Sequence, residues 1–240
     1  RWIFLESIAY LFIYPIGHRA SRNFLRLWFE VNISNIGFGM SSRDEALNSQ
    51  KKWFPYNKGG EFRKWYGNLE YIVNWENDGY EIRNFIDENG KLRSRPQNKD
   101  FYFKKSVSWS KISSKKTNKI AFRFYDRCIF ADAGMSLFSP YIDTIIALCN
   151  TNLFSYFLKI ISPSNYDVGY ISLIPYKKAL SNSDIFIQSY RSDWDAYETS
   201  WDFQSLPLLR PEYRSHSLPA AYTGVRAAWQ AMTEEMQRLE

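Results

Sequence analysis

Aromatic and basic residues are interleaved over residues 51–79 (KKWFPYNKGGEFRKWYGNLEYIVNWENDG). Flat rings of this kind can stack on nucleic-acid bases, and flexible cations can neutralise phosphates. Gly59 and Gly60 would let the backbone come close to a bulky partner, because neither carries a side chain. The alternative is an aromatic core beneath a basic surface, which the residue types alone favour because large rings are mostly buried. The rings are Trp53, Phe54, Tyr56, Phe62, Trp65, Tyr66, Tyr71 and Trp75, and the cations are Lys51, Lys52, Lys58, Arg63 and Lys64.

A second polar and basic run covers residues 108–116 (SWSKISSKK). Lysines there could contact phosphates, and the polar side chains could contact base edges. The alternative is a soluble hairpin with lysines at its rim, which the charge pattern alone favours. The residues concerned are Ser108, Ser110, Lys111, Ser113, Ser114, Lys115 and Lys116.

Six segments of the chain resemble one family of enzymes. They are KWFPYNKGG, SWSKISSKK, FADAGMSLF, IISPSNYDVGYISLIP, DWDAYETSWDFQSLPLL and WQAMTEEMQRLE, and they cover most of the chain from about Asn23 onward. KWFPYNKGG and ETSWDF are the specific motifs. Together they resemble the region after the methylase core in BREX-type adenine-specific DNA methyltransferases of phage defence (the PglX family). They are also similar to restriction–modification enzymes that fuse methylase and specificity domains.

The resemblance implies double-stranded DNA as the partner and a DNA target-recognition role for both basic runs. The residues to which it assigns DNA proximity are Lys51, Lys52, Lys58, Gly59, Gly60, Arg63, Lys64, Ser110, Lys111, Ser113, Ser114 and Lys115. It also implies an upstream methylase domain, with S-adenosylmethionine as the methyl donor of the parent protein. The alternative function is a protein–protein assembly module of the same defence system, which would use the aromatic block and the last helix.

The chain lacks the motifs that methylation needs, so we expect no catalysis, cofactor site or metal site in it. Family members hold a flipped adenine with an Asn-Pro-Pro-Tyr-like motif, and no two of the nine prolines here are adjacent. Gly37-Phe38-Gly39 is too short for a methyl-donor loop. His18 and His216 are far apart and lack neighbouring cysteines, which argues against zinc. Cys128 and Cys149 lie in apolar segments and fit a core in the reducing cytoplasm.

Composition permits a nucleic-acid partner without requiring one. Lysine and arginine total 31 against 25 acids, a net charge of +6, and aromatics make up 18% of residues. The apolar stretch 2–16 is interrupted by Glu6 and is shorter than the ~20 residues that span a bilayer, so we expect a buried helix there.

Periodicity predicts the secondary structure. We expect helices over 1–31 (with Ser21 as a cap), 41–50, 80–87, 141–149, 152–161 and 176–190. Strands are expected over 70–75, 107–110, 120–125, 129–131 and 170–174, with 107–131 forming an antiparallel meander and 55–60 a loop. A final helix carries a heptad seam, packed on the domain rather than used for dimerisation, with Glu234 pairing to Arg238. The seam residues are Tyr222, Val225, Trp229, Met232, Met236 and Leu239.

These elements predict a mixed α/β (α+β) fold. A target-recognition domain with an antiparallel sheet and packed helices would occupy residues 41–190. Residues 1–40 would be a helical connector from the catalytic domain, and residues 191–240 a helical extension.

Overall fold

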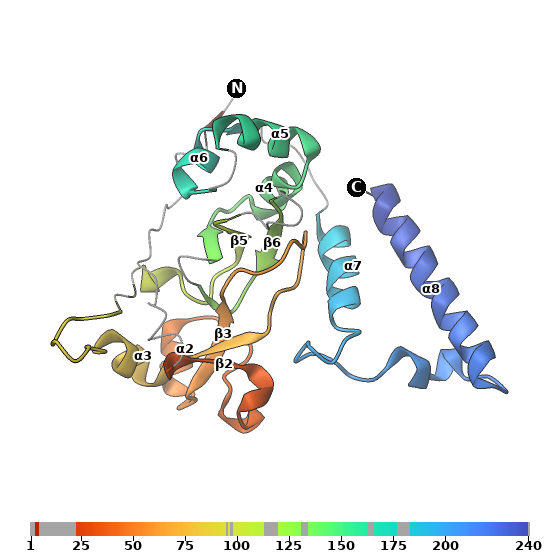
Figure 1. The fold of residues 1–240 in the computed structure, drawn as a ribbon, viewed down its shortest axis with the longest axis horizontal. Coiled ribbons are helices and arrows are strands. Elements are labelled where there is room, and N and C mark those ends of the chain that lie inside the picture. Colours follow the sequence, from red (N-terminus) through yellow and green to blue (C-terminus); the bar gives the residue numbers. More distant parts are fainter. Residues whose placement is uncertain are drawn as a thin grey trace. The chain divides into compact units, whose positions relative to one another are not determined.

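The structure is a computed structural model that describes residues 3–4, 23–94, 96, 98–112, 120–130, 134–162, 166–176 and 183–239 (Figure 1). It forms two compact units, residues 1–182 and 183–240. The first unit holds the sheets and the second is helical, so the mixed α/β fold is confirmed. The boundary expected at residue 190 falls inside helix α7 (Asp184–Trp194) of the second unit.

The first sheet of unit 1 has four strands in the order β2-β4-β3-β7. These are β2 (Leu25–Leu27), β4 (Tyr71–Asn74), β3 (Trp53–Asn57) and β7 (Ile129–Phe130). β4 pairs antiparallel with both neighbours, whereas β7 pairs parallel with β3 through Tyr56 and Asn57. The strand expected over 70–75 is confirmed. Pro55 lies within β3 rather than in a loop, at a position where β7 does not pair, so the missing N–H costs no bond to β7.

The helix expected over 1–31 is wrong for Ile3–Phe4 and from Leu25 onward, whereas Asn23 and Phe24 are helical. Leu25 and Leu27 belong to β2, and a 3₁₀ helix, η2 (Trp28–Glu30), follows. Leu25 lies opposite Val73 of β4, and both side chains are buried, so pairing with a distant strand overrides the local helical pattern. The Ser21 cap, His18 and the helix expected over 2–16 lie outside the described residues, apart from strand β1 (Ile3–Phe4).

Several short helices accompany the first sheet of unit 1. Helix α2 (Arg43–Asn48) confirms the expectation for 41–50, since the Ser42 side chain accepts the backbone N–H of Glu45. Helix α3 (Glu76–Arg83) contains three consecutive left-handed residues, Asn77, Asp78 and Gly79, which interrupt it with a turn. Two further 3₁₀ helices are η3 (Ile33–Asn35) and η4 (Lys99–Phe101).

The second sheet has the order β6-β5-β8 and is antiparallel throughout. Its strands are β5 (Ser106–Ser110), β6 (Phe122–Tyr125) and β8 (Gly134–Leu137). β5 and β6 confirm two expected strands. Trp109 and Phe122 are buried and Phe124 is half-buried. The expected meander is wrong at its third strand. Left-handed Arg127 (φ 55°) redirects the chain, and β7 joins the first sheet while β8 takes its place.

Helices cover the far side of the second sheet. α4 (Ile142–Cys149) contacts β5 and β6, and α5 (Asn152–Ile161) and α6 (Val168–Ser172) lie beyond it, as Figure 1 shows. The strand expected over 170–174 is wrong, because the Asp167 carboxylate caps a helix by accepting the N–H of Gly169. Strand β9 (Pro175–Tyr176) then pairs with β1. Among described residues no single helix could cross a membrane; α4 and α5 are long and apolar enough only as a pair bent by 72°.

Unit 2 consists of α7, the 3₁₀ helices η5 (Pro207–Leu209) and η6 (Pro211–Tyr213), and α8 (Leu218–Leu239). The expected final helix is confirmed, and it packs on the other three elements. Its seam is only partly used, since Val225 is buried whereas Tyr222 and Trp229 are exposed. The expected Glu234–Arg238 pair is wrong. Arg238 instead meets Glu235 at 2.6 Å, since a side chain three positions away is also within reach on a helix.

Candidate nucleic-acid interface

The glycine loop, residues 58–69, connects β3 to β4 and runs along the second sheet on its way. The Trp65 N–H donates to the Phe122 carbonyl at 2.8 Å, and the Phe124 N–H donates to the Trp65 carbonyl at 2.7 Å. Trp65 thus extends the edge of the sheet beside β6. The Tyr125 hydroxyl donates to the carbonyl of Gly67 at 2.8 Å, which fastens the end of the loop to the same strand. The loop is therefore held in one conformation by backbone and side-chain bonds.

Both glycines of the loop are used inside the fold. The Gly60 N–H donates to Ser110 Oγ at 3.1 Å, and that hydroxyl donates back to the Gly60 carbonyl at 2.9 Å. Gly59 (φ 82°) and Gly60 (φ 146°) adopt backbone angles that other residues rarely take. A Cβ on Gly60 would also lie 2.8 Å from the side-chain nitrogen of Asn68. The close approach that the sequence suggested is thus an approach to Ser110 and Asn68.

Arg123 supports the loop from below and was missed by the sequence interpretation. Only 1% of it is exposed. Its guanidinium donates to the carbonyls of Glu61 and Arg63 at 3.4 and 3.2 Å, and to Ser110 Oγ at 3.2 Å. Among described residues its Nε has no hydrogen-bond partner. An arginine between two phenylalanines of a strand was the available signal, but strand alternation alone placed it opposite the rings.

A buried polar network joins the two sheets beneath the loop. The Asn57 amide donates to Ser108 Oγ and, at 3.3 Å, to the Gly134 carbonyl, while Ser108 Oγ donates to the Met135 carbonyl at 2.6 Å. Gly134 is required here, because a Cβ would lie 2.5 Å from the Asn57 carbonyl oxygen. The end of β3, the start of β8 and the middle of β5 are thereby fixed together.

The structure brings one group of the expected DNA-binding residues together and separates another. Lys58 lies over the Tyr71 ring at 4.0 Å, and Lys111 follows Ser110 and pairs with Asp167 at 3.5 Å. Ser113, Ser114 and Lys115 lie outside the described residues. The group around the glycine loop, which we call the loop site, comprises Lys58, Gly59, Gly60, Arg63, Lys64, Ser110 and Lys111.

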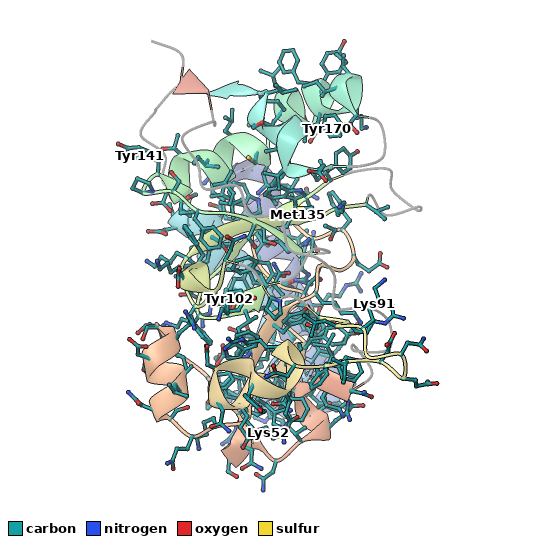
Figure 2. All side chains as sticks on the ribbon, turned by 90° about the vertical axis from the view of Figure 1, so that its left-hand side faces the viewer. Lys52, Lys91, Tyr102, Met135, Tyr141 and Tyr170 are labelled. Carbon is teal, nitrogen blue, oxygen red and sulfur yellow. The ribbon has the colours of Figure 1, made fainter. Side chains whose placement is uncertain are left out.

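Lys51 and Lys52 do not belong to the loop site. They precede β3 whereas Lys58 follows it, a separation of roughly 20 Å along an extended strand. Lys51 Nζ donates to the Ser34 carbonyl at 2.6 Å, and Lys52 pairs with Glu76 at 3.2 Å (Figure 2 shows Lys52 among the elements of the first sheet). Both cations are thus tied to other groups at the opposite end of the strand.

The aromatic block does not offer ring faces for base stacking. Five of its rings are buried and the remaining three are half-buried. The alternative of an aromatic core is therefore correct for these rings, while Lys58 is exposed and the other four cations are half-buried. The five buried rings are Phe54, Tyr56, Trp65, Tyr66 and Trp75.

Other candidate chemistries find little support among the described residues. Burial raises the pKa of both the Cys128 and Cys149 thiols, so neither is an activated nucleophile. His216 is exposed. No group of three or more His, Cys, Asp or Glu side chains that could hold a metal occurs in the described part of the chain. Gly37 packs against the ring of Phe54, with no room for a side chain between them.

Comparison with known proteins tests whether the chain is related to the family that its sequence resembles. The chain is 35% identical over 213 residues to the adenine-specific methyltransferase PglX of Lacticaseibacillus casei (strain Zhang). It is 33% identical over 196 residues to the adenine-specific methyltransferase BrxX of Escherichia coli O9:H4 (strain HS). The chain is homologous to a region of the BREX-type adenine-specific methyltransferases. No protein-family model matches it.

The homology covers most of this chain but little of those methyltransferases. The matches span 83% and 78% of the chain, yet only 17% and 15% of PglX and BrxX. The resemblance expected from the six segments is confirmed. The chain spans about a sixth of the length of its relatives, so the parent's activity has to be argued separately.

Proposed function

We propose that this chain recognises DNA sequence for an adenine-N6 DNA methyltransferase of a cytoplasmic phage-defence system, of BREX or restriction–modification type. Catalysis and S-adenosylmethionine binding are assigned to another part of the parent, because this sequence has no Asn-Pro-Pro-Tyr-like motif. The observation that carries the proposal is the loop site. A fixed loop presents Lys58, Arg63 and Lys64 beside the strand end that carries Ser110 and Lys111.

Electrostatics support this assignment of the loop site. The 58–69 segment carries three cations and one acid, Glu61, for a net charge of +2. Cations that displace condensed counterions from phosphates supply sequence-independent affinity and orient a protein on the duplex. In this proposal Lys58, Arg63 and Lys64 position the protein. The run that begins at Ser110 and Lys111 reads bases, because the loop site places it directly beside the positioning cations.

Rigidity of the loop supports the same function. Arg123, Ser110 and the β6 residues Phe122 and Phe124 hold the loop through six hydrogen bonds to its backbone groups. A loop that is already ordered loses less conformational entropy on binding than a mobile one. The internal use of Gly59 and Gly60 thus serves binding by fixing where the cations stand.

The assembly-module alternative is less well supported. It requires the aromatic block to be a protein interface, and most of that block is buried in unit 1. The two functions differ in salt dependence, because DNA affinity falls steeply with salt whereas the affinity of an aromatic protein interface changes little.

Residues 191–240 are proposed as a helical extension of the recognition domain. The boundary between the recognition domain and this extension is better drawn at residue 182, because residue 190 lies within α7.

A region exchange in a full-length methyltransferase tests the proposal. The parent would receive the homologous region of the L. casei PglX in place of residues 23–182, and methylated adenines would be mapped by sequencing. We expect the methylated motif to change to that of the donor. A chimera that still methylates the recipient's motif would overturn the proposal.

An inactive chimera would be interpreted by direct binding. The unmodified full-length protein would be titrated with cognate and scrambled duplexes. Each titration would be done with and without a competing polypeptide that consists of residues 23–182. We expect the competitor region to weaken discrimination between the two duplexes. Discrimination that the region leaves unaffected would favour the assembly module.

A further inference from the structure

Helix α5 is apolar on two opposite faces. Phe154 and Leu158 point into unit 1 and are buried at 1% and 0% exposure. On the other side, Leu153, Tyr156, Phe157 and Ile160 are 61%, 62%, 45% and 65% exposed. Their spacing of i, i+3, i+4 and i+7 places them in one stripe. A helix with two apolar faces normally buries both, so among the described residues one face of α5 lacks a partner.

The neighbouring helix continues this surface. α6 contacts α5 and adds Tyr170 and Leu173, which are 39% and 56% exposed. Figure 2 shows Tyr170 at the α5–α6 end of unit 1, the end where β1 also lies. Single exposed apolar residues are ordinary, whereas a contiguous apolar patch marks an interaction surface. We call these six side chains the α5–α6 face.

We propose that the α5–α6 face packs against the polypeptide that precedes this chain in the full-length methyltransferase. Two observations select this occupant. The homologous region makes up only 17% and 15% of PglX and BrxX, so more than four-fifths of such a protein lies outside it. Strand β1 pairs with β9, which is separated from α6 by two residues, so β1 enters unit 1 at the α5–α6 end (Figure 2). The inference rests on the homology and is independent of DNA recognition.

Hydroxyl-radical footprinting of the unmodified full-length methyltransferase provides the first test. Tyr156 and Tyr80 are matched residues of one type, with 62% and 66% exposure in unit 1. We expect Tyr80 to be oxidised and Tyr156 to lose its oxidation, because the docked polypeptide shields it. Equal oxidation of the two tyrosines in a monomeric sample would overturn the proposal.

Photocrosslinking identifies what covers the face. A benzoylphenylalanine would replace Tyr156 in the full-length protein, and Lys159 would be replaced in the same way as the matched control on the same helix, outside the stripe. We expect position 156 to crosslink within one polypeptide to residues ahead of this chain, with loss of that product at position 159. Crosslinks to a second copy, to later residues or to added lipid vesicles would each overturn it.

Folding of the substituted protein is checked by mapping methylated adenines, which depends on an intact enzyme. A failed region exchange in the test of DNA recognition would leave the crosslinking result untouched. Conversely, absence of the crosslink with a successful exchange would remove this interface alone. The two proposals can therefore fail separately.

Discussion

Removing two adjacent cations from the glycine loop should weaken DNA binding in a way that a matched pair elsewhere does not. The site variant is Arg63→Ala with Lys64→Ala. The control is Lys104→Ala with Lys105→Ala, which removes the same charge from two exposed neighbours just before β5. Lys105 directly precedes β5 and Ser110 is its last residue. The control pair therefore lies roughly 17 Å from the loop site along the extended strand. Overall charge is thus equal in both variants, and only its position differs.

Counterion release sets the expected magnitude. Each phosphate contact contributes about 0.9 to the slope of log affinity against log salt, so losing two should flatten the slope by up to ~1.8. Because this contribution vanishes near 1 M salt, a slope change of ~1.8 corresponds to about 30-fold weaker binding at 0.15 M salt. The loss should be equal for cognate and scrambled duplexes, since phosphate contacts carry no sequence information. The control should keep both the slope and the affinity.

Fluorescence titrations of the full-length methyltransferase with both duplexes, at four or more salt concentrations, would measure these slopes. An unchanged slope in the Arg63/Lys64 variant would remove the loop from the DNA interface. Equal flattening in the Lys104/Lys105 control would show that total charge, not the loop site, governs binding. Either result would refute the reasoning from the geometry.

Three further predictions concern stability, each measured by denaturant unfolding of the same protein. Phe122→Ala should cost ~3–5 kcal/mol because its ring is fully buried against Phe154, and a loss below about 0.5 kcal/mol would contradict its place in the core. Gly134→Ala should cost ~1–3 kcal/mol by pushing apart the strands joined at that glycine. Burial alone would raise the pKa of the Asp78 carboxyl, but the hydrogen bond from Arg43 and nearby cations lower it. The ionised carboxylate therefore stabilises the folded protein at neutral pH, and this contribution is lost as the pH falls through the lowered pKa. Asp78→Asn should thus cost ~1–3 kcal/mol at pH 7, with the difference fading below about pH 4, and a pH-independent difference would refute this account.

Elements with a strong local signal could be predicted from the sequence. α2 has its Ser42 cap, α4 and α5 have helical periodicity bounded by a short break, and α8 has a sustained heptad pattern. β5 and β6 show period-two alternation because their residues face two different environments. In each case the residues that determine the element lie within the element itself.

Elements that depend on distant partners could not be predicted. β2 is a strand because β4 lies beside it, and β7 leaves the second sheet because β3 offers it a buried position. α6 was read as a strand because its five residues give too little length for periodicity, although Asp167 was a usable cap signal. The loop site, too, could be predicted only in part. Its cations are visible in the sequence, but their separation from Lys51 and Lys52 follows from β3 being extended.

Arg123 accounts for the fixed backbone of the glycine loop that we propose as a binding surface. Burying a cation is costly unless its donors find acceptors, and here the acceptors are two loop carbonyls and Ser110. The arrangement fixes the loop backbone and places a positive charge beneath Arg63 and the neighbouring cations. Phosphates that approach these cations would reduce the repulsion among their like charges. A loop with a rigid backbone and a net positive charge is suited to a polyanion. A buried core segment would have no reason to retain that charge.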